Sequence, residues 1–152
     1  MKTWIVGVDP GKTGGVAVLD TVFPSESAVY DMPMLGPEPD SRELARLMSG
    51  AFLVVIEFQG AMPKQGVSST FSLGMQYGKI LAVADLSGAR ILRPRPAEWK
   101  RGMSLIGKEK DDSRAEAIRQ FPQLAGMLSR KMDHGRAEAL LIALWGQRHE
   151  VT

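Results

Sequence analysis

Three acidic residues of this chain stand beside apolar stretches, where an unpaired carboxylate is costly. Asp9 follows the apolar run 4–8, and Glu57 follows a second apolar run, 52–56. Glu138 begins the apolar run of the last predicted helix. A carboxylate at the end of a buried strand needs a cation or a proton donor to meet it. Two strands and one helix that each deliver an acid therefore favour a metal site.

Each acid by itself has a simpler explanation. Asp9 precedes Pro10 and Gly11, which is typical of a turn or a cap, and Glu138 is typical of a solvated helix face. Glu57 is harder to explain in this way, because five apolar residues precede it and no turn residue follows until Gly60. It is the joint placement of the three acids that indicates function.

The size and composition of the chain limit what the protein can be. Its 152 residues suffice for one domain with a sizeable core. No apolar run reaches the roughly 18 residues of a membrane helix, so we expect no membrane association. The absence of cysteine excludes disulfides, zinc–thiolate sites and cysteine nucleophiles. The chain passes straight into a strand without a signal peptide, so we expect a cytoplasmic protein.

Charge is unevenly distributed along the chain. Residues 1–89 carry a net charge of −3, residues 90–136 carry +6, and the last 16 residues carry −1. A basic segment in an otherwise acidic protein suggests that a polyanion contacts one face. A solvated surface rich in lysine and arginine is the alternative explanation.

Apolar runs and turn residues predict five strands and five helices. The strands are expected at residues 4–9, 16–19, 27–31, 52–57 and 89–93. The helices are expected from Asp40 or Ser41 to about 49, from Ser68 or Ser69 to about 86, over 96–100, from Asp112 or Ser113 to about 121, and over 133–148. Short turns link the first three strands, which should therefore be antiparallel, and the later strands alternate with helices. This order predicts an α/β fold in which helices flank a five-stranded mixed sheet.

The helix predicted to end near residue 86 carries a stripe of small residues. Gly74, Gly78 and Ala82 lie four apart and therefore share one face. A glycine inside a helix costs about 1 kcal/mol relative to alanine, so close packing is expected to compensate. The stripe should face either the sheet or a partner subunit.

Five segments in the same order resemble the RuvC family of Holliday junction resolvases, within the ribonuclease H-like superfamily. They are residues 5–11, residues 54–57, residues 72–78, the basic segments 96–100 and 107–110, and residues 136–143. The Gly-Arg-Ala-Glu-Ala-Leu form of the last segment is most like that of phage-type members. The resemblance implies a single ribonuclease H-like nuclease domain over residues 1–152, in the host-cell cytoplasm if a phage encodes it.

The resemblance also implies a metal-binding site. Asp9, Glu57 and Glu138 would hold two Mg²⁺ ions, for which Mn²⁺ would substitute, and these ions would activate the attacking and leaving oxygens of a phosphodiester. The family has a fourth ligand about one turn before the last acid. Helix geometry favours His134, which lies four residues before Glu138, whereas carboxylate chemistry favours Asp133. His134 would otherwise assist proton transfer.

The expected activity is Mg²⁺-dependent resolution of four-way DNA junctions by paired strand cleavage, performed by a homodimer that forms through residues 69–86. The residues expected to contact DNA phosphates are Lys64, Lys100, Lys108, Lys110 and Arg136, with Arg93, Arg95, Arg101 and Lys131 as further candidates. Phe58, Met62 and Phe71 are candidates for unstacking bases at the junction, and the alternative for Phe71 is a place in the core or at an interface.

Two other functions stay open: cleavage of other branched DNA or RNA, and binding of junctions without cleavage. The turn 11–15 also resembles the phosphate loop of actin-like kinases, but those proteins need a second similar domain that 152 residues do not provide.

Overall fold

A five-stranded mixed sheet forms the centre of the molecule. The computed structural model describes residues 3–150. The strands are β1 (Trp4–Asp9), β2 (Gly15–Asp20), β3 (Ala28–Asp31), β6 (Ala51–Ile56) and β7 (Arg90–Leu92), in the spatial order β3-β2-β1-β6-β7. The first three strands are antiparallel, and β1, β6 and β7 are parallel. The predicted mixed sheet, with its first three strands antiparallel, is therefore confirmed.

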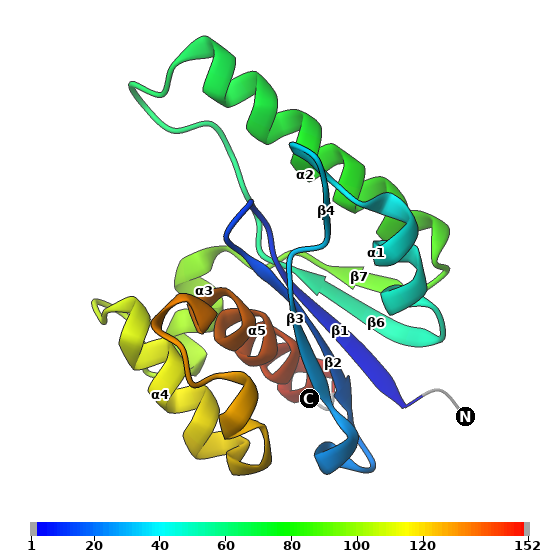
Figure 1. The fold of residues 1–152 in the computed structure, drawn as a ribbon, viewed down its shortest axis with the longest axis vertical. Helices are drawn as coiled ribbons and strands as arrows, with labels where there is room; N and C mark the ends of the chain where they lie inside the picture. The colour runs from blue at the N-terminus through cyan, green and yellow to red at the C-terminus, as the bar shows by residue number, and fades with distance from the viewer. Residues whose placement is uncertain (1–2, 151–152) are drawn as a thin grey trace.

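Helices cover both faces of this sheet (Figure 1). The helices α1 (Ser41–Met48) and α2 (Val67–Leu86) lie on one face. On the other face lies α5 (His134–Glu150), against which α3 (Pro96–Gly102) and α4 (Lys110–Gln120) pack. Within the described residues, no helix is both long enough and apolar enough to cross a membrane.

The alternation of side chains along β1 and β6 divides the core into two layers. Val6 and Val8 of β1 and Val54 and Ile56 of β6 pack on the α1/α2 side. The intervening positions, among them Ile5, Leu53 and Val55, pack on the α5 side. Successive side chains of a strand point to opposite faces of the sheet. Asp9, two residues after Gly7, and Glu57, two residues after Val55, therefore also point toward α5.

Glycines let α5 lie directly against the sheet. A Cβ atom added to Gly7 of β1 would overlap the carbonyl oxygen of Ala139, and one added to Gly15 of β2 would lie 2.7 Å from the carbonyl oxygen of Gly135. A Cβ atom added to Gly135 would in turn overlap the backbone of the β1–β2 turn at Thr13. Close backbone approach is a known use of glycine. The start of α5 is thereby fixed beside the carboxyl end of β1.

The starts of α2 and α4 differ from the sequence prediction. The N-cap of α2 is Gly66 rather than Ser68 or Ser69, and it makes no side-chain capping bond. The helix α4 begins at Lys110, and the Asp112 carboxylate accepts from the N–H of Glu109 at 2.9 Å. Asp112 is therefore inside the first turn rather than at the cap. The predicted cap of α1 is confirmed, since the Asp40 carboxylate accepts from two backbone N–H groups.

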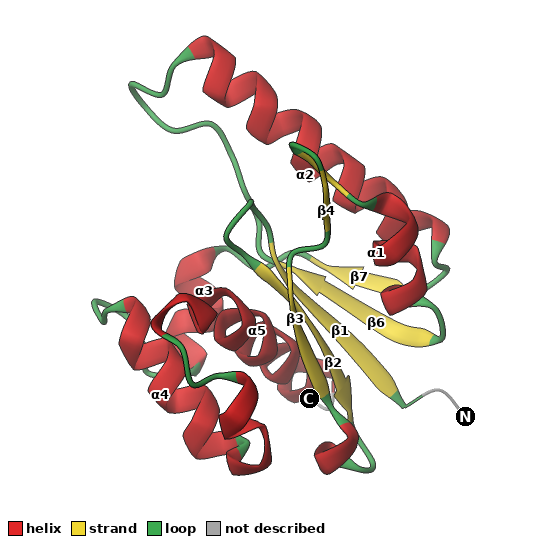
Figure 2. Ribbon diagram, in the orientation of Figure 1, coloured by secondary structure: helices red, strands yellow, loops and turns green. Residues whose placement is uncertain are grey.

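Short elements that the sequence did not predict join the main ones (Figure 2). A small hairpin pairs β4 (Met34–Leu35) with β5 (Glu38–Pro39), within a segment that was predicted to be loop. Three 3₁₀ helices span Pro24–Glu26, Pro122–Met127 and Lys131–Asp133. Such elements rest on one or two turns of backbone, too short for hydrophobic periodicity to reveal.

The small-residue stripe of α2 does not face the sheet. Gly74, Gly78 and Ala82 are exposed, and a Cβ atom added to either glycine would meet no heavy atom within 4 Å. The first part of α2 extends beyond the edge of the sheet (Figure 1). Of the two packing partners considered for the stripe, the sheet is therefore excluded.

Candidate active site

The carboxyl ends of β1 and β6 bring Asp9 and Glu57 together. The two strands are parallel, with Gly7 opposite Val55 and Val8 opposite Ile56. The N–H of Glu57 donates to the carbonyl of Val8 at 3.1 Å, so the ladder continues one residue past β6. Both acids are only 9% exposed. Two buried carboxylates thus lie side by side on the face that α5 covers.

Glu138, in the second turn of α5, completes a cluster of three acids. The pKa of Asp9 is raised well above its ordinary value by burial, by the negative charges of Glu138 and Glu57, and by a hydrogen bond to the Glu138 carboxyl. The positive charge of Lys100 opposes this shift. Asp9, Glu57 and Glu138, which the sequence predicted to meet, are therefore close enough to repel one another. We call these three residues the acid cluster.

A tryptophan holds Glu57 in place. The indole N–H of Trp99 on α3 donates to the Glu57 carboxylate at 2.7 Å, and both groups are buried. Burial raises the pKa of Glu57, the Trp99 hydrogen bond opposes that shift, and the charge of Glu138 adds to it. Ser113 on α4 similarly donates to Glu138, over a longer 3.4 Å.

Sequence reasoning missed both Trp99 and Ser113 as contributors to the site. For Trp99 a signal existed, because a buried indole N–H usually finds a hydrogen-bond partner and the residue precedes the basic Lys100 in a short helix. For Ser113 the sequence gave no comparable signal, since the residue was interpreted as a helix cap.

We predict that Trp99→Phe raises the pKa of Glu57 further and destabilises the fold. The substitution keeps a ring in the core but removes the donor that stabilises the charged carboxylate. An unpaired buried acceptor costs about 1–3 kcal/mol. Carboxyl resonances in ¹³C NMR, followed over pH, would measure the pKa. The control is Trp145→Phe, at a buried tryptophan that stacks on His149. An unchanged Glu57 pKa in Trp99→Phe would contradict the role of the indole.

Asp133 is engaged away from the acid cluster. Its side chain is 1% exposed and accepts from the backbone N–H of Arg130 at 2.8 Å and from the guanidinium of Arg130 at 2.8 and 3.1 Å. Arg136 lies 3.7 Å away. Burial alone would raise the pKa of Asp133, but the Arg130 hydrogen bonds and the charges of Arg130 and Arg136 hold it below its ordinary value. This carboxylate is already neutralised by protein cations.

His134 is the first residue of α5 and lies one turn before Glu138. Its Nδ1 atom is buried and has no hydrogen-bond partner within residues 3–150. A buried ring nitrogen without a partner is costly unless a ligand meets it. Of the two alternatives for a fourth ligand, the geometry therefore favours His134 over Asp133.

The four lysines that were predicted to contact DNA phosphates fall into three groups. Lys100 lies near the acid cluster, where its charge acts on Asp9 and Glu57. Lys108 and Lys110 are exposed at the start of α4, the end of the helix from which Ser113 reaches Glu138. Lys64 is exposed in the loop before α2.

Arg136 stands apart from the other predicted phosphate contacts because protein groups already engage it. Its guanidinium donates to Asp31 at 2.8 Å and to the carbonyl of Met127 at 3.0 Å. These bonds tie the start of α5 to the end of β3. Arg136 therefore has a structural function in the fold, whatever it contributes to binding.

The donor chemistry of the acid cluster fits a hard divalent cation. Carboxylate oxygens are the ligands that Mg²⁺ prefers, and a cation would relieve the repulsion that raises the pKa of Asp9. In the described part of the chain, the side chains of acidic and histidine residues do not form a group of three or more that is close enough to hold an ion.

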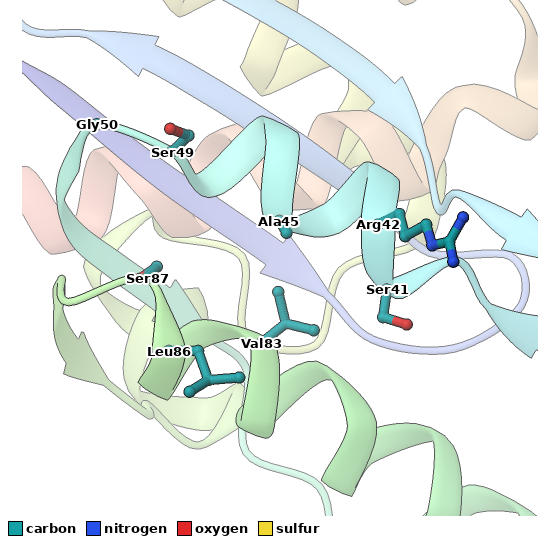
Figure 3. A pocket seen from close by; sticks show the side chains of 8 residues that line it. All are labelled: Ser41, Arg42, Ala45, Ser49, Gly50, Val83, Leu86 and Ser87. Carbon is teal, nitrogen blue, oxygen red and sulfur yellow. The ribbon is translucent and has the colours of Figure 1, made fainter.

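A groove of about 450 Å³ between α1 and α2 contains none of the candidate site residues (Figure 3). Its lining includes Ala45, Val83 and Leu86, and Arg42 is its one ionisable residue. It therefore offers no pair of groups for acid–base or metal chemistry, and the acid cluster stays the candidate active site.

Comparisons with known proteins agree with this architecture. No protein-family model matches the chain. A stretch of 79 residues, 51% of the chain, is 38% identical to the chloroplastic Holliday junction resolvase MOC1 of Chlamydomonas reinhardtii. That stretch spans 8% of the length of this curated relative.

Solved structures match the fold over almost the full length of the chain. The structure of Thermus thermophilus RuvC superposes with a TM-score of 0.61 and 18% identity, over 97% of this chain and 95% of that one. Thermus thermophilus RuvC in complex with a Holliday junction substrate gives a TM-score of 0.64 and 17% identity over the same shares. The chain therefore has the ribonuclease H-like fold of the RuvC Holliday junction resolvases.

Proposed function

We propose that this protein is a Mg²⁺-dependent, structure-selective endonuclease that resolves Holliday junctions by paired phosphodiester hydrolysis. The observation that carries the proposal is the acid cluster: three electrostatically coupled carboxylates from β1, the end of β6 and α5, of which Asp9 and Glu57 are buried, on a RuvC-like fold. The matched stretch of the resolvase MOC1 supports the same activity. Membership of a phage-type group stays a prediction from residues 135–140.

Asp9, Glu57 and Glu138 would hold the metal, with His134 as the fourth ligand. Mg²⁺, when bound, neutralises phosphate charge and activates the attacking and leaving oxygens. The protein's own contribution is positioning. The indole of Trp99 and the hydroxyl of Ser113 orient two of the carboxylates. Removing a side chain that hydrogen-bonds to a metal ligand typically lowers metal affinity or activity 10–100-fold.

Basic side chains around the acid cluster would position the DNA. Lys100 lies beside the acids, and Lys108 and Lys110 lie at the exposed start of α4, so together they would contact the backbone near the cleaved phosphate. Lys64 would contact a more distant arm of the junction. Such contacts orient a strand without reading its sequence, and their contribution to affinity should fall steeply with salt.

We predict that Asp9→Asn stabilises the metal-free protein at neutral pH. The pKa values of Asp9 and Glu57 are raised above their ordinary values of 3.8 and 4.5. At these two residues the folded state therefore holds protons to higher pH than the unfolded state, and their contribution to stability falls as pH rises from the ordinary to the raised pKa values. With EDTA at pH 8, Tm should rise by at least about 2 °C, the shift that 1 kcal/mol produces in a chain of this size.

The Tm advantage of Asp9→Asn should disappear below pH 4, where the wild-type acids are protonated as well. Added Mg²⁺ should raise the Tm of the wild type and leave that of the variant nearly unchanged. Thermal unfolding followed by circular dichroism would measure both effects. A Tm difference between Asp9→Asn and the wild type that does not grow with pH in EDTA would contradict the electrostatic repulsion.

The exposed face of α2 supports a homodimer. Val67, Phe71 and Met75 are exposed apolar residues on the same side of the helix as Gly74 and Gly78. A C2 dimer through this face would present two acid clusters to the two symmetric strands of a junction.

We predict that Gly78→Glu weakens the dimer at least about tenfold, since it places a charge in the centre of the apolar face. Sedimentation velocity at micromolar concentration would measure the dissociation constant. Gly126→Glu makes the same change at a glycine with open space elsewhere in the chain. A monomeric wild type at that concentration would contradict the dimer.

The decisive experiment for the function is cleavage of synthetic substrates with Mg²⁺. A mobile four-way junction would be compared with a fork, a flap, a linear duplex and the corresponding RNA. Symmetric nicks in the junction alone are expected. Equal cleavage of forks or RNA would instead establish the broader branched-substrate nuclease.

A non-catalytic junction-binding protein is the alternative from another functional class. Such a protein would bind junctions without nicking them at any Mg²⁺ or Mn²⁺ concentration. The same cleavage series therefore separates this alternative from both nuclease functions.

A further inference from the structure

Two prolines keep the segment that follows β7 extended. Its sequence is Arg93-Pro94-Arg95-Pro96, and a residue that precedes proline is biased toward extended conformations. Arg95 accordingly has a φ of −71° and a ψ of 154°. Side chains two residues apart in an extended chain point to the same side. Pro94 is buried and both arginines are exposed, so the two guanidinium groups project together from the protein.

Two aromatic rings hold these guanidinium groups in place. The guanidinium carbon of Arg93 lies 5.4 Å from the centre of the Phe58 ring and 5.3 Å from the centre of the Tyr77 ring. Arg93 also donates to the Tyr77 hydroxyl at 3.1 Å. The guanidinium carbon of Arg95 lies 4.6 Å from the centre of the Phe58 ring. Because a guanidinium group is planar and weakly hydrated, it stacks well on aromatic faces, and both charges are thereby ordered.

No carboxylate in the described part of the chain neutralises these two charges. Among residues 3–150, neither Arg93 nor Arg95 forms an ion pair. Other arginines do, since Arg114 and Arg130, for example, each pair with an aspartate. Guanidinium groups that are ordered, exposed and unpaired are well suited to bidentate contact with phosphate.

The two arginines lie beside the acid cluster, on its α2 side. Phe58 directly follows Glu57, and its N–H donates to the carbonyl of Pro94 at 2.7 Å, which ties the arginine segment to the end of β6. Tyr77, which accepts from the arginine segment, belongs to α2. Lys100, whose charge acts on Glu57, belongs to α3, which packs against α5 on the other face. The acid cluster therefore has a lysine on one side and two arginines on the other.

We propose that Arg93 and Arg95, held by Phe58 and Tyr77, bind the DNA backbone beside the cleaved phosphate, on the α2 side of the acid cluster. We call these four residues the arginine clamp. With Lys100 across the acids, the clamp would hold one strand at two points and place the phosphodiester between them at the metal site. Phe58 is then a positioning residue rather than a wedge between bases, because guanidinium groups already lie over its ring. This proposal rests on the proposed junction-resolving function.

The first test is the salt dependence of affinity for a synthetic four-way junction, measured by fluorescence anisotropy in Mg²⁺-free buffer. Each phosphate contact contributes about 0.9 to the slope of log affinity against log salt. Arg93→Gln/Arg95→Gln should therefore reduce that slope by about 1–2 and weaken binding at least about tenfold at low salt. The control Arg42→Gln/Arg46→Gln removes two exposed arginines of α1 and should change the slope by less than about 0.5. An unchanged slope in Arg93→Gln/Arg95→Gln would overturn the clamp.

Three further variants separate an ordered clamp from positive charge alone. Arg93→Lys/Arg95→Lys keeps both charges but loses the planar fork, so it should keep the slope and bind at least about threefold more weakly. Phe58→Leu should behave in the same way, and Phe58→Tyr, which keeps a ring, should bind like the wild type. Wild-type affinity of the lysine variant would overturn the clamp, since charge alone would then suffice.

A double-mutant cycle tests whether Phe58 acts through the arginines. Added to Arg93→Gln/Arg95→Gln, Phe58→Leu should cost no further affinity, because the groups that it positions are already gone. A full additional loss would overturn the positioning role and return Phe58 to direct contact with a base.

The outcomes distinguish this proposal from the function on which it rests, because the binding series does not depend on cleavage. A junction that is bound with the predicted slopes but never cut with Mg²⁺ would overturn the nuclease and support the clamp. Cleavage by the wild type, together with an unchanged slope and an unchanged single-turnover rate in Arg93→Gln/Arg95→Gln, would overturn the clamp and support the nuclease.

Discussion

Glu57→Gln is expected to lower junction cleavage more than about 100-fold while leaving junction affinity within about threefold of the wild type. Groups that only orient metal ligands account for 10–100-fold, and loss of a ligand itself should exceed that range. The substitution keeps the shape of the side chain and an oxygen that can accept from Trp99. It removes only the charge that would attract Mg²⁺. It also removes a repulsion from Glu138, so the variant should fold at least as stably as the wild type.

Single-turnover cleavage and electrophoretic mobility shift with the same labelled junction would measure the two effects of Glu57→Gln. Glu26→Gln makes the same change at an exposed glutamate remote from the acids and should cleave at the wild-type rate. Unchanged cleavage by Glu57→Gln would remove this residue from the mechanism. Parallel loss of binding and cleavage would instead assign Glu57 a structural role.

The strand pattern is why two of the three acids could be predicted to meet. In a parallel pair of strands, the side-chain period of two and the shared carboxyl edge fix both the face and the end at which Asp9 and Glu57 appear. The two apolar runs that lead to them are unambiguous in the sequence. The prediction that Glu138 joins these two acids also required the resemblance to the RuvC family. Helix periodicity alone does not say which face of the helix lies over which end of the sheet.

The helix side of the site could not be predicted for a local reason. Whether Asp133 or His134 points toward Glu138 depends on the residue at which α5 begins. A one-turn 3₁₀ helix that ends at Asp133 settles that start, together with the ion pairs between Asp133 and Arg130. Neither has a periodic signal in the sequence. The hydrogen bond between Arg136 and Asp31 could not be predicted either, since the two residues are 105 positions apart in the sequence.

Gly7→Ala is expected to destabilise the protein by about 3 kcal/mol or more and to impair cleavage at the same time. The added Cβ atom would overlap the carbonyl oxygen of Ala139 and lie 2.7 Å from the backbone nitrogen of Ala143. Both are backbone atoms of α5, so no side-chain rotation can relieve the contact. Overpacking of this kind typically costs 1–3 kcal/mol, and rigid backbone atoms place this case at the upper end. Tm should fall by roughly 6–12 °C.

The functional consequence of Gly7→Ala follows from what α5 carries. Glu138 directly precedes Ala139, so a helix pushed away from β1 takes this carboxylate away from Asp9. Thermal unfolding and single-turnover cleavage, each measured well below the lowered Tm, would separate the loss of stability from the loss of geometry. Gly126→Ala adds the same methyl group where no heavy atom lies within 4 Å and should change stability by less than about 0.5 kcal/mol.

Ala143→Gly, combined with Gly7→Ala, removes a Cβ atom that would lie 2.9 Å from the new methyl group but leaves the Ala139 carbonyl in place. Only partial recovery of Tm is therefore expected from the double variant. If Gly7→Ala alone kept the Tm of the wild type, α5 would not be in close contact with β1 at this glycine. The close approach of Glu138 to Asp9, on which the metal site depends, would then lose its structural basis.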